Sequence, residues 1–75
     1  MEPMTMRYYV IYERGADGGW GAYPPELPGV GVVADTKAEA KESIKAAIAM
    51  HIVGLRADGL AVPEPTGEFV EIDAA

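Results

Sequence analysis

The sequence predicts a small α+β domain in which three strands are followed by one long helix and a final strand. Runs of aromatic and β-branched residues, separated by glycine- and proline-rich turns, are typical of strands. A proline-free stretch with apolar residues at three- and four-residue spacings is typical of a helix. The 75 residues suffice for one core, so residues 1–75 are expected to form a single domain. The fourth strand should lie parallel to the first in the sheet, with the helix on one face.

The first two strands are expected to form a hairpin. Residues 5–13 carry bulky side chains on both faces, which favours a strand inside the sheet. The cluster Gly15-Ala16-Asp17-Gly18-Gly19 supplies the positive φ angles of a tight turn, and residues 20–23 then form the returning strand. Pro24-Pro25-Glu26-Leu27-Pro28-Gly29 cannot pair in a ladder, because three of its six residues lack an N–H group. This stretch is therefore a rigid loop, after which residues 30–34 form the third strand.

The strongest local signal belongs to the helix. Thr36-Lys37-Ala38-Glu39 is a capping box, in which the threonine hydroxyl and the glutamate carboxylate each accept a hydrogen bond from a backbone N–H group. A helix is predicted from Lys37 to about Asp58, and Gly59 is suited to end it. Its apolar face consists of Ala40, Ile44, Ala47, Ile48, His51, Ile52 and Leu55. We expect His51 to be a packed side chain with one hydrogen bond, because no serine or carboxylate is placed beside it to form a catalytic pair.

The chain closes with a stiff connector over residues 63–67 and a short β-rich stretch over residues 68–73, which we interpret as an edge strand. Residues 1–5 and 74–75 are expected to be flexible tails. A single helix covers one face of the sheet, so the other face is a candidate partner surface. We interpret Trp20 as a core residue and the neighbouring proline loop as a possible contact region.

Composition excludes several classes of function. Twelve acidic and six basic residues give a net charge of −6, which argues against a nucleic-acid-binding surface and fits either a basic partner or simple solubility. The absence of cysteine excludes disulfides, thiolate metal sites and cysteine nucleophiles. The N-terminus does not have the pattern of a signal peptide, and the longest apolar stretch is too short to span a membrane. A cytoplasmic protein is expected.

Five pieces of this sequence occur in an order that resembles the HicB-like antitoxin family. They are the aromatic first strand, Asp17-Gly18-Gly19-Trp20, Pro25-Glu26-Leu27-Pro28-Gly29, Asp35-Thr36 with Glu39-Ala40, and Pro63-Glu64-Pro65. Each piece alone is common, but the ordered set covers the chain from about Arg7 to Ile72. One departure is Ala34, which stands where the family often has a glycine before the Asp-Thr pair.

The resemblance implies a partial ribonuclease-H-like fold that serves as an antitoxin. The implied partner is a HicA-type toxin, a small basic ribonuclease that degrades messenger RNA. Many family members also carry a C-terminal DNA-binding segment. The last predicted strand ends shortly before Ala75, so operator binding is not expected of this chain.

We therefore expect a binding module and not an enzyme, with no metal, cofactor or catalytic residue, that covers the active site of its toxin. The predicted contact residues are Pro25, Glu26, Leu27, Asp35, Glu39 and Glu42. Charge complementarity would mainly speed association with a basic partner. A free sheet edge and a bare face also favour a homo-oligomer, either a dimer or a tetramer.

Two alternatives remain at the level of the sequence. The chain could be a HicB-like domain without a toxin that acts as a homo-oligomeric adaptor. It could also be a metal-dependent nuclease, whose carboxylates would have to converge on two metal ions about 4 Å apart. Glu13, Glu39 or Glu42, and Asp73 are the available acids. The centre of the first strand is apolar and Glu39 is already explained by the helix cap, so these acids are better interpreted as a solvated face.

Overall fold

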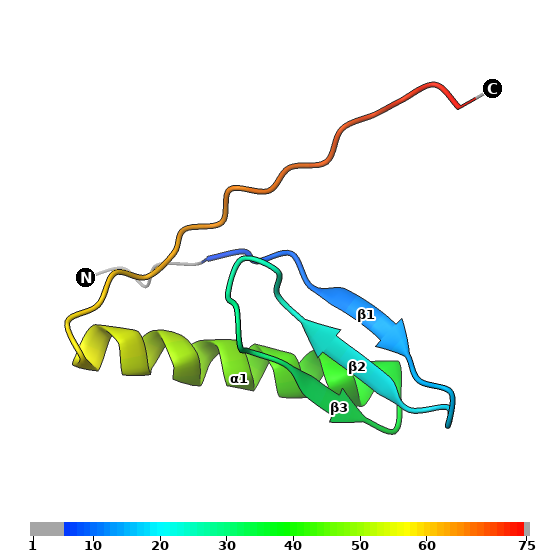
Figure 1. The fold of residues 1–75 in the computed structure, drawn as a ribbon, viewed down its shortest axis with the longest axis horizontal. Helices are drawn as coiled ribbons and strands as arrows, with labels where there is room; N and C mark the ends of the chain where they lie inside the picture. The colour runs from blue at the N-terminus through cyan, green and yellow to red at the C-terminus, as the bar shows by residue number, and fades with distance from the viewer. Residues whose placement is uncertain (1–5, 75) are drawn as a thin grey trace.

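A three-stranded antiparallel sheet packs on one long helix in the computed structural model, which describes residues 6–74 (Figure 1). The strands are β1 (Ile11–Arg14), β2 (Trp20–Tyr23) and β3 (Val32–Ala34), in the order β1-β2-β3, and the helix is α1 (Lys37–Ala57). The predicted α+β class, the antiparallel meander and the single helix on one face are confirmed. The bounds of β2 agree with the prediction.

The register of the sheet decides which side chains form the core. Tyr12 pairs with Ala22, and Ala22 pairs with Val32, so these side chains share the face that lies against the helix. The core is centred on Ala22 and on Ala40 and Ile44 of α1, each no more than 1% exposed. The residues between them in the strands point to the opposite face, which no helix covers within the described residues. Ile11, Tyr23 and Val33 lie there, and Val33 is 85% exposed.

The C-terminal end of α1 forms as the sequence predicts, and the N-terminal cap forms in part. The Thr36 hydroxyl accepts a hydrogen bond from the Glu39 N–H group at 3.1 Å, which satisfies one free donor of the first turn. The reciprocal bond to the Glu39 carboxylate is absent among the described residues, so half of the capping box forms. At the other end, Gly59 has a φ of +70°, and the Leu60 N–H group donates to the Leu55 carbonyl at 2.8 Å. This Schellman geometry requires the left-handed conformation that glycine adopts readily.

Two strands are shorter than predicted. β1 begins at Ile11, because residues 6–10 are extended but have no ladder partner; Thr5 lies outside the described residues. β3 begins at Val32, because the Val30 N–H group bonds to the Leu27 carbonyl at 3.3 Å and so belongs to the preceding turn. In both cases local aromatic or β-branched content indicated a strand where the tertiary structure offers no partner.

The fourth strand predicted over residues 68–73, here called the C-terminal segment, is absent from the sheet of the described residues. The segment is extended and leaves the body of the protein, running away from α1 (Figure 1). Phe69, Val70 and Ile72 are between 75% and 85% exposed. The described residues thus contain the meander and helix of the expected ribonuclease-H-like arrangement without its last strand. Of the tails expected at residues 1–5 and 74–75, only Ala74 lies within the described residues.

Candidate partner-binding surface

The structure separates the predicted contact residues into two groups. Pro25, Glu26 and Leu27 lie in the loop between β2 and β3, whereas Asp35, Glu39 and Glu42 lie at and after the turn that leads into α1. Because β3 runs from the first group toward the second, the two groups lie at opposite ends of the sheet (Figure 1). The six residues therefore do not form one continuous patch.

The loop group is held rigidly by its own backbone. The Leu27 N–H group donates to the Pro24 carbonyl at 3.1 Å, and Gly29 supplies a positive φ of +88°. Leu27 is 1% exposed, so its side chain packs inside and supports the loop. Pro25, by contrast, is exposed. The loop thus presents a stiff surface whose ordering would cost little entropy on binding.

Glu26 is engaged by its own chain. Its carboxylate accepts hydrogen bonds from the Thr66 N–H group, from the Thr66 hydroxyl at 2.8 Å and from the Gly67 N–H group at 3.4 Å. The two hydrogen bonds from Thr66 are the main reason that the pKa of Glu26 is lowered, since they favour the charged carboxylate. We call this contact the Glu26 clamp. It orders the connector before the C-terminal segment.

The second group forms an acidic end of the molecule. Asp35 and Glu39 are exposed, and Glu42 lies 3.4 Å from Lys45, one turn along the helix. Asp35 also borders a shallow cleft of about 460 Å³ that Glu13 and Asp17 line from the hairpin side. The carboxylates in this region come from the hairpin, the turn and the helix. Arg14 lines the same cleft, where three carboxylates thus face one guanidinium group.

Trp20 packs toward the core, as predicted. It lies partly buried on the helix side of the sheet, where the Arg14 guanidinium approaches its ring at 5.6 Å. The Lys37 ammonium lies 5.0 Å from the Tyr12 ring and 5.8 Å from the Trp20 ring. These cation–π contacts tie the start of α1 to the sheet. Trp20 is therefore a structural residue and not an exposed anchor.

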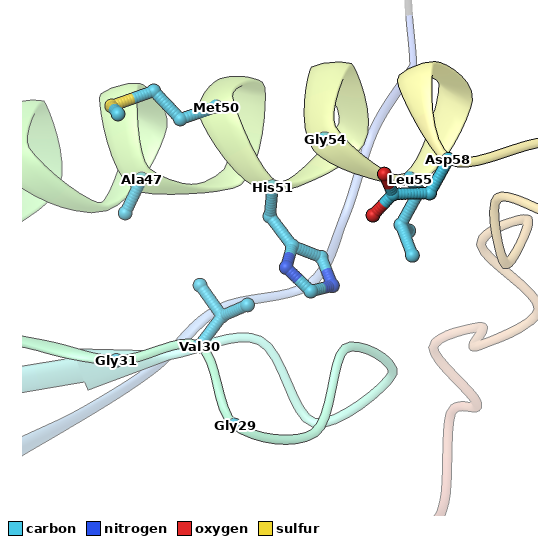
Figure 2. Close-up of a pocket in the computed structure, with 9 residues that line it drawn as sticks. All are labelled: Gly29, Val30, Gly31, Ala47, Met50, His51, Gly54, Leu55 and Asp58. Atoms are coloured by element: carbon cyan, nitrogen blue, oxygen red, sulfur yellow. The ribbon is translucent and has the colours of Figure 1, made fainter. Parts of the chain in front are cut away.

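A cleft of about 550 Å³ opens between the C-terminal half of α1 and residues 29–31. The His51 imidazole points across it toward Val30, and Asp58 lies near its end (Figure 2). The hydrogen bond predicted for His51 is not formed with any described residue, because the ring faces the open cleft and not a packed polar group. No serine lines the cleft with it. Asp58 is the carboxylate that lines the cleft with His51, and no hydrogen bond joins the two side chains among the described residues.

A groove of about 740 Å³ lies between residues 6–12 and α1, beside the outer edge of β1. Its apolar lining includes Met6, Val10, Ile44, Ile48 and Ile52. Exposed basic side chains surround it, namely Arg7, Lys41, Lys45 and Arg56, and no acidic residue is among its described lining residues. We call it the basic groove. The sequence analysis did not predict this groove, because its four basic residues come from distant positions in the chain. The one local signal is the four-residue spacing of Lys41 and Lys45, which places both on one side of a helix.

The acids considered for a nuclease do not converge. Within residues 6–74, no group of three or more histidine, aspartate and glutamate side chains is placed to hold a metal ion. Glu13 instead accepts a hydrogen bond from the Tyr23 hydroxyl at 3.3 Å. Partial burial and the neighbouring Glu13 carboxylate raise the pKa of Tyr23.

α1 does not have the length and apolar character of a membrane-spanning helix.

Comparison with known proteins gives two matches. Residues 8–73 match the model of the HicB_like antitoxin family of bacterial toxin–antitoxin systems. Over 49 residues, the chain is 50% identical to the UPF0150 protein ssl0738 of Synechocystis sp. (strain ATCC 27184 / PCC 6803 / Kazusa). These residues are 65% of this chain and 68% of the Synechocystis protein. No solved structure matches the chain.

Proposed function

This chain belongs to the HicB_like antitoxin family, and we propose that it is an antitoxin that binds and neutralises a HicA-type toxin in the cytoplasm. The family match over residues 8–73 is the observation that carries the proposal. In this proposal the chain is a binding module that covers the active site of an mRNA-degrading ribonuclease. It supplies no catalytic residue, metal or cofactor.

The acidic end of the molecule is the surface that best suits such a partner. Asp35, Glu39 and Glu42 are exposed, and Glu13 and Asp17 add charge from the hairpin. A basic ribonuclease presents the opposite charge to this end, so attraction would speed the encounter and exclude RNA from the same surface. Pro25 offers a second, rigid contact at the other end of the sheet. Leu27 supports that loop from the core.

Co-expression tests the proposal directly. The chain is produced together with a candidate HicA-type toxin, a small basic protein whose gene adjoins its own, and the pair is purified through a tag on one partner. We expect a stable complex and, in a cleavage assay, protection of messenger RNA from the toxin. If the two proteins neither co-purify nor show inhibition of cleavage, the antitoxin proposal is overturned.

Charge reversal then locates the contact. Asp35→Lys together with Glu42→Lys should slow association with the toxin by about tenfold at low salt, with a smaller effect at high salt. The matched control is Asp58→Lys with Glu64→Lys, which changes the net charge equally at the other end of α1. Equal effects of the two pairs would indicate that net charge alone matters and that the acidic end is not the contact.

The alternative function is that of a homo-oligomeric adaptor without a toxin. It is favoured by the uncovered face of the sheet and by the exposed apolar side chains of the C-terminal segment. Light scattering on the purified chain measures its oligomeric state. This measurement has to be combined with the co-purification, because an antitoxin can also self-associate. An oligomer that binds no toxin would support the adaptor.

A further inference from the structure

A small pocket lies where the C-terminal segment passes the loop between β2 and β3. It has a volume of about 350 Å³, and Tyr9 and Phe69 supply its aromatic lining. The centroids of the two rings are 5.3 Å apart and the ring planes meet at 88°. Tyr9 is 52% exposed and Phe69 is 85% exposed, so both rings leave apolar surface in water. Exposed aromatic surface around a pocket is typical of an interaction site, and we call this one the aromatic pocket.

The charge around the aromatic pocket is negative. Glu26 and Glu68 line it, and no basic residue is among its described lining residues. The hydrogen bonds from Thr66 and Gly67 lower the pKa of Glu26, so its carboxylate is charged at neutral pH. Glu68 follows directly on Gly67, whose N–H group the clamp holds. The pocket therefore combines two aromatic rings with two carboxylates, one of which is fixed in place.

This combination suits an organic cation. The face of an aromatic ring is electrically negative, so it attracts an ammonium or guanidinium group that lies within about 6 Å of the ring centroid. A guanidinium group fits best, because it is planar, weakly hydrated and able to stack on a ring while its N–H groups donate to a carboxylate. The exposed Pro25 also lines the pocket and offers apolar surface to the methylene stem of an arginine.

The size of the aromatic pocket suits one side chain. Cavities that enclose small-molecule ligands run from about 300 to 1,000 Å³. This pocket is at the lower end of that range and most of its lining residues are exposed, so it would hold a projecting side chain better than a whole free ligand. We propose that the aromatic pocket receives the guanidinium group of an arginine on a protein partner. The proposal deepens the antitoxin function and rests on it for the identity of that partner, a basic toxin.

A titration with capped arginine tests the chemistry of the pocket without a toxin. Phe69 is the only phenylalanine of the chain, so isotope-labelled phenylalanine reports on its ring alone in an NMR spectrum. N-acetyl-arginine N-methylamide should shift the ring signals of the full chain saturably, with a Kd in the millimolar range. The corresponding citrulline compound has nearly the same shape without the charge, and it should bind at least about tenfold more weakly. Equal binding of the two compounds, or no saturable shift with the arginine compound, would overturn the proposal.

Two variants separate the contributions of the charge and of the rings. Glu68→Gln keeps both rings and should weaken binding of the capped arginine about two- to threefold. Its matched control is Glu71→Gln, which removes the same charge from the same segment outside the pocket and should leave the Kd unchanged. Tyr9→Leu keeps an apolar side chain at a half-exposed position and should weaken binding about two- to fivefold. Equal losses for Glu68→Gln and Glu71→Gln would show that only the net charge attracts the cation, which would overturn the proposal.

Binding to a candidate toxin then tests the source of the arginine. Tyr9→Leu should weaken toxin binding about two- to fivefold, and one arginine of the toxin, replaced by glutamine, should give a similar loss. The two losses should not add in the double variant, because both remove the same contact. A toxin complex that is insensitive to Tyr9→Leu would overturn the proposal. A chain that binds capped arginine and no toxin would instead overturn the antitoxin function and leave the chemistry of the pocket standing, so the two failures are distinguishable.

Discussion

The carboxylate of Glu26 accepts hydrogen bonds from both the backbone N–H group and the hydroxyl of Thr66, forty residues further along the chain. This single contact joins the rigid loop after β2 to the connector that follows α1. Two further contacts hold the same stretch: the Tyr8 hydroxyl donates to the Pro63 carbonyl, and the Phe69 ring meets the Tyr9 ring edge-on at 5.3 Å. The path of the connector and of the C-terminal segment therefore depends on Glu26 together with these two tyrosines.

Glu26→Gln should loosen this connection without changing the shape of the side chain. The neutral amide has one acceptor oxygen and makes weaker hydrogen bonds than a carboxylate. We expect the hydrogen-exchange protection of the Thr66 and Gly67 amides to fall by about three- to tenfold. Glu42→Gln at the other end of the molecule is the matched control and should leave these amides unaffected. Unchanged protection in Glu26→Gln would mean that the clamp does not order the connector.

The clamp should also respond to pH. Hydrogen bonding lowers the pKa of Glu26 in the folded protein below its ordinary value of 4.5. A lowered folded pKa means that the clamp contributes fully above about pH 4.5 and is lost as the pH falls through the folded value. The NMR shifts of the Thr66 and Gly67 amides should therefore titrate below pH 4.5. The same shifts should be flat in Glu26→Gln, and a titration that persists there would assign the effect to another group.

Removal of the helix cap should cost stability. Thr36→Ala deletes the hydroxyl that accepts from the Glu39 N–H group, and the free energy of unfolding should fall by about 1 kcal/mol. Thr36→Ser keeps the acceptor and should retain most of that free energy. Urea denaturation followed by far-ultraviolet circular dichroism measures both. Equal losses in the two variants would argue that the threonine methyl group, and not the hydroxyl, stabilises the end of the helix.

Replacing either of two glycines near the end of α1 by alanine should change the stability of the fold, in opposite directions. Gly54 lies inside the helix with no atom within 4 Å of an added methyl group, so Gly54→Ala should stabilise the fold by about 0.5–1 kcal/mol. Gly59 has a φ of +70°, and Gly59→Ala should destabilise it by about 1 kcal/mol. Thermal denaturation of both variants gives the sign directly. A shift in the same direction for both would contradict the assigned end of the helix.

The core is small, so one residue should have a large effect. Ile44 is 1% exposed and packs with Ala22 and Ala40. Ile44→Ala should lower the free energy of unfolding by about 2–5 kcal/mol, a large fraction of the stability of a domain of this size. Met50→Ala, on the exposed side of the same helix at 76% exposure, should change it by no more than about 0.5 kcal/mol. A loss of less than about 1 kcal/mol for Ile44→Ala would mean that Ile44 is not at the centre of the core.

Elements with strong local signals were predicted well. The Thr36 cap, the Gly59 stop and the apolar spacing between them define α1 almost to the residue, because helix hydrogen bonds join positions four apart in sequence. The glycine-rich turn between β1 and β2 likewise places the hairpin. Residues 68–73 were predicted as a strand on composition alone, and that prediction was wrong for this sheet. A strand exists only with a partner, and partners are far apart in sequence.

The sequence by itself determined the hairpin turn, the helix, the charge and the family of this protein, since each depends on residue types and their spacing along the chain. Only the tertiary structure decided that Leu27 is buried, that the two groups of predicted contact residues lie at opposite ends of the sheet, and that four basic side chains border one apolar groove. It also decided that Glu26 holds the connector at Thr66. The physical reason is the same in each case. Burial and charge clustering arise from contacts between residues remote in sequence, and a local sequence pattern does not predict such contacts.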